Sequence, residues 1–303
     1  MKLNQLRDFV AVAERGSLRA AARETGIAQP AITRSIQALE HSLGTQLFVR
    51  EARGVHLTPV GEDFLLRAMS ILNDVRRAGE AVRQKQGALE GELTLGFSIA
   101  AHFGVLSEVI AAFKRRFPSV RLRLVEGFFP TLQTDLRNGL LDAYVGPVPD
   151  DAHPTDLTVT KLFDNRRVVV GRCDHPLRGA RTLADLVEAE WMTTSITRDA
   201  PDELRQVFAD AGLQMPRLMY QTQSALSALV TLIQTDALAM MPVQWVEAPV
   251  VEGWLDCIPL DVDFAAPPIM LVQRIGLGTT PAGEYFVHLV RQLARSDSAH
   301  PDS

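Results

Sequence analysis

Cysteine and clustered histidine are scarce in this 303-residue chain. The two cysteines, Cys173 and Cys257, lie far apart without a CxxC motif, and the seven histidines are scattered without an HExxH motif. Such spacings mark redox and zinc sites, and a disulfide framework needs more cysteines. We therefore expect no metal and no cofactor, and we interpret both thiols as ordinary small core side chains.

Long apolar runs are also missing. The chain has no stretch of about 18 apolar residues, and its N-terminus lacks the apolar core of a signal peptide. A composition of 47% hydrophobic and 22% charged residues is ordinary for a globular protein of two or three domains. The sequence therefore predicts a cytoplasmic protein that does not bind membranes.

Positive charge is in deficit overall but not everywhere. The formal net charge is −5, yet residues 1–90 hold 13 Lys and Arg against 10 Asp and Glu, a balance of +3, and the remainder carries −8. A local basic excess suits a segment that contacts phosphates. Since the excess is small, we expect several copies of this segment to act together on one site.

The basic segment contains a helix-turn-helix pattern. Ser17 is a good N-cap and Gly26 suits the C-terminal turn, which predicts a short first helix. A second helix is predicted to begin near Gln29 and Pro30, because proline is tolerated in the first turn. The apolar stripes of this helix and of a helix before the motif are Ile32, Ile36, Leu39 and Leu43, and Leu3, Leu6, Phe9, Val10 and Ala13.

The second helix carries polar side chains on its other face, and these can bond base edges or phosphates in a major groove. After Gly44, two short β-prone runs around a turn at Arg53 and Gly54 are typical of the wing of a winged helix. We place this DNA-binding domain at residues 1–58. Its predicted contacts with double-stranded DNA are Gln29, Pro30, Thr33, Arg34 and Gln37 from the helix, and Arg50 and Arg53 from the wing.

Residues 59–88 predict one long linker helix with a surface for self-association. After Pro59 the stretch contains no proline, and apolar or small residues recur at alternating steps of three and four. This heptad spacing is typical of a seam between paired helices. The alternative is a helix packed on its own domain. The predicted seam comprises Leu65, Ala68, Leu72, Val75, Gly79 and Val82.

From residue 91 onward, predicted strands alternate with predicted helices, which indicates an α/β fold with a parallel-rich sheet. A first set has strands at 93–97, 120–125 and 140–146, and a second has strands at 166–172, 191–195, 218–222 and 238–242 with a helix at 182–190. The chain returns through 267–275 to a final helix begun by Thr280 and Pro281. We expect a two-lobed cleft domain at 91–295, with lobe 1 at 91–162 and 267–295, lobe 2 at 163–266, and a disordered tail at 296–303.

Ligands of such sheets bind beyond the carboxyl ends of the strands, where helix N-termini offer N–H groups to an anion. Ser98 sits at such a point, and His102 could pair with a carboxylate or sulfonate. Ser224 and Thr131 are placed as N-caps whether or not a ligand binds, so a structural role competes at each hydroxyl. The predicted ligand contacts are Ser98, Ala100, His102, Pro130, Thr131, Gly146, Pro147, Thr193, Thr194, Ser195 and Ser224.

The N-terminal segment resembles the LysR-type transcriptional regulators. Their signature is a specific run of residues, and this chain departs from it at Ala28, where the family usually has a serine N-cap. The matching residues are Ala21, Ala22, Gln29, Pro30, Ala31, Ile32, Thr33, Ile36, Leu39, Glu40, Leu43, Gly44, Leu47, Phe48, Arg50, Leu57, Thr58, Pro59 and Gly61.

The resemblance implies a winged helix-turn-helix, a linker helix that pairs two chains, and a periplasmic-binding-protein-like effector domain. It also implies a ligand-responsive bacterial regulator that forms a homotetramer as a dimer of dimers, bends promoter DNA and engages RNA polymerase. Ser98 stands where the family commonly places a serine or threonine on the effector. The stretch 125–143 looks most similar to members that sense aromatic acids or sulfonates, and Phe97, Phe128 and Phe129 suit an aromatic anion.

Two other classes share parts of this pattern. The sequence Gly96-Phe97-Ser98-Ile99-Ala100 is close to the GxSxG elbow of serine hydrolases, but its last position is alanine and no Asp and His pair stands out downstream. A solute-binding protein would share the lobed architecture, but it would not need a helix-turn-helix. We therefore predict a transcription factor without catalytic residues.

Overall fold

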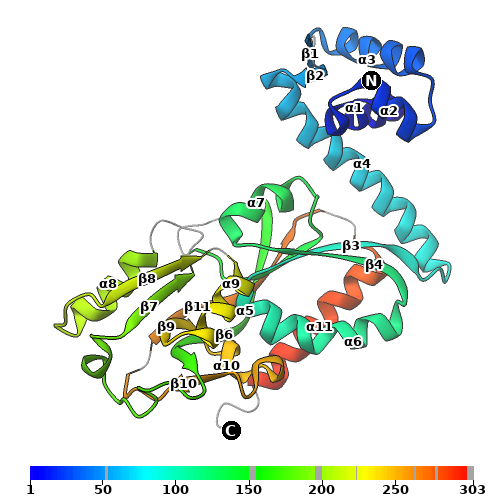
Figure 1. Ribbon diagram of the computed structural model, residues 1–303. Helices are drawn as coiled ribbons and strands as arrows, with labels where there is room; N and C mark the ends of the chain where they lie inside the picture. The colour runs from blue at the N-terminus through cyan, green and yellow to red at the C-terminus, as the bar shows by residue number, and fades with distance from the viewer. Residues whose placement is uncertain are drawn as a thin grey trace.

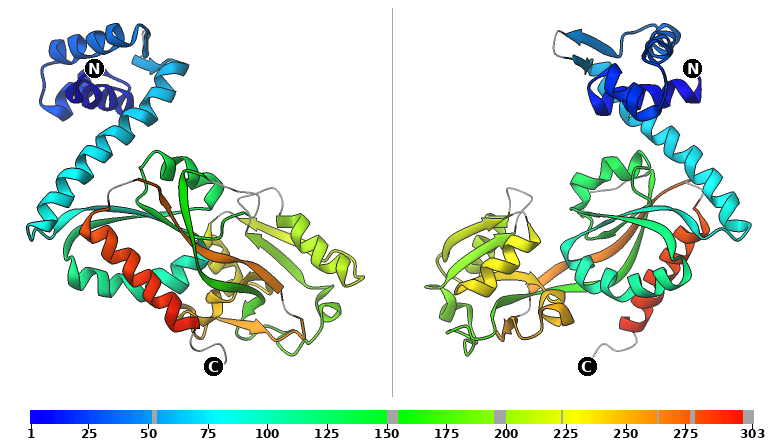
Figure 2. Two further views of the ribbon diagram at one scale, coloured as in Figure 1. Left: turned by 180° about the vertical axis from the view of Figure 1, so that it is seen from behind. Right: turned by 45° about the vertical axis from the view of Figure 1, so that its right-hand side comes forward.

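The computed structural model describes residues 1–51, 54–149, 155–194, 200–222, 224–262, 264–276 and 279–298. The N-terminal part is a small helical domain with a β-ribbon, and the C-terminal part has two α/β lobes (Figure 1). Figure 2 shows that helix α4 (Pro59–Lys85) runs between the two parts. Within the described ranges, no helix has the length and apolar character needed to cross a membrane.

The N-terminal domain forms where local capping signals predict it. The Ser17 hydroxyl accepts a hydrogen bond from the Ala20 N–H at 3.4 Å, and Gly26 ends the helix with φ of +69°. Ala28 precedes the next helix without a side-chain cap, and Pro30 lies in its first turn. The elements are α1 (Leu3–Arg15), α2 (Leu18–Thr25), α3 (Gln29–Leu43), and the antiparallel strands β1 (Phe48–Glu51) and β2 (Gly54–Leu57).

The core of this domain contains most of the predicted apolar stripes. Phe9 and Leu39 are fully buried, and the Phe9 ring lies 5.2 Å from those of Phe48 and Phe64. Leu43 is an exception, because it is 38% exposed at the last position of α3. The predicted stripe therefore ends one turn earlier, at Leu39.

Helix α4 divides the predicted seam into two parts. Ala68 is buried in the core of the N-terminal domain, and Leu65 and Leu72 are half-buried against it. A part for these three residues in a seam with a second chain stays a prediction. Farther along, Val75 and Val82 are 45% and 57% exposed. The first half of α4 thus packs on the N-terminal domain, as the alternative predicts, whereas the second half leaves these apolar side chains exposed.

The two lobes share one continuous sheet. Among the described residues the strand order is β4-β3-β5-β11-β6-β9-β7-β8, and β10 pairs with β6 at the side. Strands β3, β4 and β5 pair in parallel, as do β7, β8 and β9, whereas β6 and β11 run antiparallel to their neighbours. Their bounds are β3 (Glu90–Phe97), β4 (Ser119–Glu126), β5 (Ala143–Gly146), β6 (Leu157–Arg172), β7 (Glu190–Thr194), β8 (Arg217–Thr222), β9 (Ala237–Pro242), β10 (Leu255–Ile258) and β11 (Phe264–Arg274).

Helices cover both faces of the sheet in each lobe, and separate apolar clusters fill the layers. In lobe 1, α6 (Ser107–Arg116) and α11 (Pro281–Ser298) cover one face, and α7 (Phe129–Arg137) the other. A short α5 (Ile99–Ala101) and a π-helical segment η1 (His102–Leu106) lead into α6. Lobe 2 has η2 (Leu183–Leu186), α8 (Ala200–Asp210), α9 (Ala225–Gln234), α10 (Gln244–Glu247) and η3 (Pro249–Val251).

Several elements differ from the sequence prediction. Strand β6 begins nine residues before 166 and crosses between the lobes, pairing with β11 in lobe 1 and with β9 and β10 in lobe 2. The predicted helix at 182–190 is a single 3₁₀ turn at Leu183–Leu186. Strand β7 already begins at Glu190, which leaves few residues for a longer helix. Helix α11 continues through Ser298, so the first three positions of the predicted tail are helical, and 299–303 lie outside the described residues.

Candidate functional site

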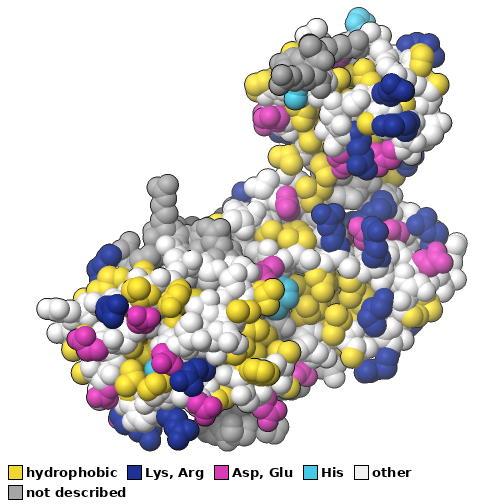
Figure 3. Space-filling view, viewed as in Figure 1, with side chains coloured by type: hydrophobic (Ala, Val, Ile, Leu, Met, Phe, Trp, Pro, Cys, Tyr) yellow, Lys and Arg dark blue, Asp and Glu magenta, His cyan; other side chains and the backbone are white. Residues whose placement is uncertain are grey.

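Helix α3 presents a polar face opposite its buried stripe. Gln29, Pro30, Arg34 and Gln37 are exposed, and Thr33 is half-buried with its hydroxyl donating to the Gln29 carbonyl at 3.0 Å. Figure 3 shows several Lys and Arg side chains on the surface of this domain. The helix therefore offers amide and guanidinium groups at spacings that suit base edges and phosphates.

The ribbon beside α3 has the form of a wing, with Phe48 paired to Leu57 and Arg50 to Val55. Arg50 thus lies on β1, paired with Val55 of β2. Arg53, the other predicted wing contact, lies outside the described residues. The roles of both arginines in DNA contact stay predictions.

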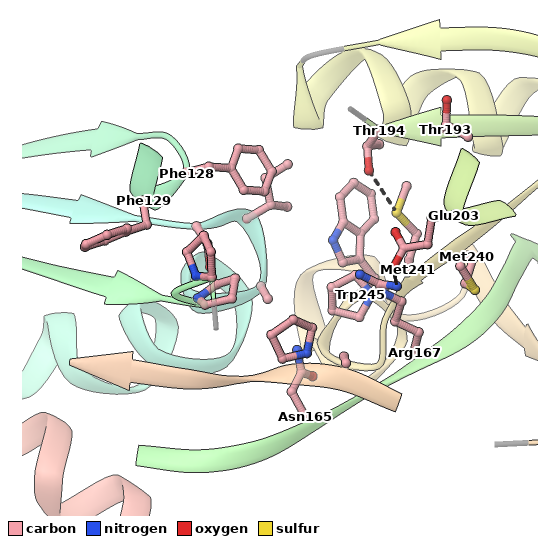
Figure 4. Close-up of a pocket in the computed structure, with 18 of the residues that line it drawn as sticks. Phe128, Phe129, Asn165, Arg167, Thr193, Thr194, Glu203, Met240, Met241 and Trp245 are labelled. Atoms are coloured by element: carbon pink, nitrogen blue, oxygen red, sulfur yellow. Dashed lines mark hydrogen bonds and ion pairs between the residues drawn. The ribbon is translucent and has the colours of Figure 1, made fainter. Parts of the chain in front are cut away.

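A cavity of about 530 Å³ lies between the lobes. Lobe 1 contributes Ile99, Phe128 and Pro147, and lobe 2 contributes Met192, Met241 and Trp245 (Figure 4). Its walls are mostly apolar, and a cavity of this size can enclose a small organic molecule. Six of the predicted ligand residues line it, namely Ser98, Ala100, Pro130, Pro147, Thr193 and Thr194.

Ser98 acts as a helix cap in this structure. Its Oγ accepts a hydrogen bond from the Ala101 N–H at 3.2 Å, and only 2% of the residue is exposed. The His102 ring binds the Ser98 carbonyl through Nδ1 at 3.0 Å and therefore does not contact the hydroxyl. Among the described residues, no hydrogen bond joins the Ser98 hydroxyl to a histidine, the contact that a nucleophile elbow needs.

Four predicted residues do not line the cavity. The His102 ring packs 5.3 Å from that of Phe97, the Thr131 hydroxyl donates to the Phe128 carbonyl, and the Ser224 hydroxyl caps α9. Gly146 is adjacent, because a Cβ there would lie 2.7 Å from Cβ of Ser98. Ser195, a further prediction, lies outside the described residues.

The sequence prediction missed the charged side chains of the cavity. Arg167 on β6 and Glu203 in the first turn of α8 form an ion pair, and they are the cation and the anion among the described lining residues. Their side chains are 20% and 46% exposed, so both can be reached from the cavity. Arg166 and Arg167 begin the predicted strand at 166–172, and nothing in the sequence indicates that one of them faces a ligand.

Trp245 joins the two lobes at the cavity wall. Its ring centroid lies 5.2 Å from that of Phe103, which belongs to η1 of lobe 1. The indole N–H of Trp245 and the hydroxyl of Thr193 are buried at the wall and have no hydrogen-bond partner in the described part of the chain. Buried polar groups are normally paired, so an acceptor atom of a ligand that reached either group would satisfy it.

A polar junction fixes α4 to lobe 1. Arg77 is 3% exposed; its Nη2 donates to the Gly139 carbonyl at 2.6 Å, and its Nε lies 2.8 Å from Oδ1 of Asp142. The Thr94 N–H donates to the other Asp142 oxygen at 2.6 Å. Burial lowers the pKa of Arg77 and raises the pKa of Asp142, and the ion pair between them opposes both shifts.

The cysteines show no reactive environment. Both are half-buried and free, and burial raises the pKa of the Cys173 and Cys257 thiols, which lowers the thiolate fraction. Within the described ranges, His, Cys, Asp and Glu side chains form no group of three that could hold a metal ion.

Two family models match the chain. Residues 3–62 match the model described as a bacterial regulatory helix-turn-helix protein of the lysR family, and residues 86–295 match the LysR substrate binding domain. Both matches agree with the division of the structure into an N-terminal domain and a two-lobed domain.

Curated relatives extend the match over nearly the whole chain, and those described here are transcriptional regulators. The SDS degradation transcriptional activation protein of a Pseudomonas species is 33% identical over 93% of each chain. The HTH-type transcriptional regulator GalR of Pseudomonas putida is 29% identical over 95% of this chain and 73% of its own.

Solved structures of similar proteins share the fold. CbnR, a LysR family transcriptional regulator, superposes with a TM-score of 0.70 at 24% identity, covering 97% of this chain and 99% of its own. CbnR complexed with its target DNA has a TM-score of 0.69 at 25% identity, covering 97% of this chain and all of its own.

Proposed function

Because the chain belongs to the LysR family of ligand-responsive, DNA-binding transcriptional regulators, we propose that it senses a small organic anion, of aromatic character, in the cavity between its lobes. The observation that carries this proposal is the cavity of about 530 Å³, which combines apolar and aromatic walls with Arg167. An aromatic body would pack on Phe128 and Trp245, and a carboxylate or sulfonate would bond the guanidinium.

The proposal includes a route from the cavity to the DNA. Strands β6 and β11 cross between the lobes, so a ligand that contacts both lobes favours one lobe arrangement over another. Lobe 1 is fixed to α4, which leads to the DNA-binding domain. A shift in lobe arrangement would then change the spacing of two DNA-binding domains, the bend of the promoter and the contact with RNA polymerase. The protein would act where the chromosome lies, in the cytoplasm.

A thermal-shift screen of aromatic carboxylates and sulfonates tests the proposed effector class. A ligand that binds only the folded state raises the melting temperature, by an amount that corresponds to about 2.7 kcal/mol at a hundredfold excess over Kd. Uncharged esters and amides of the same acids serve as matched controls. If the uncharged compounds raise the melting temperature and none of the acids does, the anionic class is wrong.

Replacing Ser98 by alanine should have two effects. Loss of the cap on Ala101 N–H should cost about 1 kcal/mol of stability. If the hydroxyl also donates to the effector, affinity should fall by roughly 5- to 150-fold, while DNA affinity without effector stays nearly unchanged. We expect both, measured by melting curves and by calorimetric titration with an acid found in the screen. Normal titration beside a lower melting temperature would leave Ser98 with the capping role alone.

Replacing Gln29 by alanine should relax sequence discrimination at one base position by about 1–3 kcal/mol. The residue is exposed at the start of α3, where recognition helices contact bases. Fluorescence anisotropy on a target duplex and on a scrambled duplex measures the difference. Gln86→Ala, an exposed glutamine just after α4, is the matched control. Equal losses on both duplexes would remove Gln29 from base readout.

We also propose a dimer of dimers, which requires two self-association surfaces. The exposed apolar side chains of α4 offer one. A second lies on lobe 2, where Met219 on β8 and Leu226 and Val230 on α9 are 51%, 69% and 52% exposed. Exposed apolar groups of this size commonly mark interaction surfaces. Sedimentation of Leu226→Glu should therefore give dimers in place of tetramers.

A further inference from the structure

The two charged side chains of the cavity raise a question about how an anion would bind there. Arg167 is the cation among the described lining residues, but it is already paired with Glu203. The pair cancels its own charge, so the described cavity wall carries no net charge to attract an acid. An acid can gain a full ion pair with Arg167 only if Glu203 gives up its place.

We propose that the Glu203 carboxylate occupies the position on Arg167 that the effector's anionic group takes, so that binding exchanges one carboxylate for the other. This inference rests on the proposed function, because it concerns the same cavity and the same class of ligand. It assigns Glu203 a role as an internal competitor and Arg167 as the specificity residue. The ligand class is a monoanion with an apolar body.

The surroundings of the pair favour this exchange. Arg167 is held by β6, which is paired on both sides, to Phe264 of β11 and to Pro242 of β9. Glu203 is 46% exposed and lies in the first turn of α8, so its side chain can turn to solvent without leaving a buried charge. The guanidinium therefore stays in place while its partner changes.

The exchange has a consequence for α8. Leu204 and Phe208 bury one side of this helix in lobe 2, whereas the ion pair ties its first turn to β6. Once an effector takes Arg167, that tie is lost and the first turn of α8 is held by fewer contacts. Binding would therefore loosen the start of α8 while it fills the cavity.

Titration of benzoate into Glu203→Gln and Arg167→Gln variants of the full chain tests the proposal, with methyl benzoate as the uncharged probe. Removing the competing carboxylate should tighten benzoate binding at least fivefold, and removing the guanidinium should weaken it at least tenfold. Methyl benzoate should bind all three proteins alike. Asp236→Asn is the matched control, because Asp236 pairs with Arg172 of the same strand at 2.8 Å but does not line the cavity.

Hydrogen exchange separates an exchange of partners from simple charge repulsion. In the wild-type protein, benzoate should speed amide exchange at the start of α8, and in Glu203→Gln it should not. Tighter binding to Glu203→Gln without a change in α8 of the wild type would mean that Glu203 only repels the anion, and the proposal would be wrong. Unchanged benzoate affinity in Glu203→Gln would also overturn it.

The same experiment distinguishes this proposal from the proposed function. If benzoate binds the wild type, Glu203→Gln and Arg167→Gln with equal affinity, the proposed anionic effector class stands, but the proposed exchange of carboxylates at Arg167 is wrong. If neither the wild type nor Glu203→Gln bound benzoate while methyl benzoate bound both, the anionic effector class and the exchange would fail together.

Discussion

Glutamate at Ile71 or Val75 should separate the chains that pair through α4, leaving dimers joined through lobe 2, and lower the affinity for a two-fold symmetric DNA site by about 10²- to 10⁴-fold, the usual gain from linking two binding modules. Ile71, Val75 and Val82 are 38%, 45% and 57% exposed, and with Ala78, also exposed, they follow steps of four, three and four. These steps place the four side chains on one face of α4, as in a coiled-coil seam.

The opposite face of α4 explains why this stripe is the one available to a second chain. Arg77, Glu80 and Gln84 are buried there, and Gln84 bridges the Glu90 carbonyl and the Ala282 N–H of lobe 1 at 2.9 and 3.0 Å. A glutamate at Val75 would bury a charge beside its symmetry copy, which a paired helix cannot accommodate. Each DNA-binding domain, once separated from its α4 partner, would also contact half as many phosphates as the pair.

Light scattering and fluorescence anisotropy against salt concentration measure the two effects. The salt slope of DNA binding should fall by about half, because it scales with the number of phosphate contacts. Arg83→Gln is the control, since it changes the charge by the same single unit at an exposed position of α4 away from the stripe. An unchanged oligomer in both glutamate variants would mean that α4 does not join two chains.

The structure changes which substitutions report on this seam. The heptad pattern pointed to Leu72, but Leu72 is half-buried against the N-terminal core, so a charge there would destabilise its own domain. Asp74 lies outside the heptad positions, but replacing it would not be a suitable control for the seam, because both its oxygens accept hydrogen bonds from Arg274 at 2.9 Å. Sequence spacing identifies a helix with apolar residues on two adjacent faces, and only the packing shows which face is already used.

The N-terminal domain could be predicted because its signals are local. Ser17, Gly26 and Pro30 act within one turn of their own helices, through a cap, a left-handed φ and a missing N–H. The buried stripe of α3 was predicted less well than its ends, since Leu43 is apolar but 38% exposed. Local signals therefore predict the first residue of a helix better than they predict how far its apolar residues stay buried.

The cavity could be predicted only in part, because its residues come from separate segments. Ser98, Pro130 and Pro147 follow strand ends, and the strand-end rule brings them together. Arg167, Glu203 and Trp245 lie on β6, α8 and α10, which meet only through the crossing of the sheet. Since β6 runs from Leu157 to Arg172 without a break, the sequence offered no turn to show that Arg167 lies at the cleft.

Replacing Arg77 by methionine should cost about 3–5 kcal/mol, because it leaves the buried carboxylate of Asp142 without its cation. Asp142 would keep its bond from the Thr94 N–H, and the Gly139 carbonyl would keep only its longer bond from the Asn73 amide at 3.4 Å. The loss should be local to the junction of α4 with lobe 1. Amide exchange of β3 and of the turn before β5 measures it, since exchange reports the free energy of local opening.

Two further variants make this prediction specific to the buried pair. Arg121→Met removes a guanidinium that is 77% exposed and pairs with Glu92 on the neighbouring strand, so it should cost less than about 1 kcal/mol. Adding Asp142→Asn to Arg77→Met removes the unpaired charge and should restore part of the loss. Equal costs for Arg77→Met and Arg121→Met would show that the buried pair does not hold the junction.

The junction also predicts a regulatory phenotype. The Arg77 side chain contacts lobe 1 and takes no part in the N-terminal core, so Arg77→Met should bind effector and DNA separately almost as the wild type does. A lobe movement reaches the DNA-binding domains only if α4 moves with lobe 1, because coupling between two sites needs a shared element that both bias. Because Asp74 and Gln84 still join α4 to lobe 1, effector should change the DNA footprint of the variant less than that of the wild type. A footprint that responds to effector as in the wild type would place the coupling in contacts other than Arg77 and Asp142.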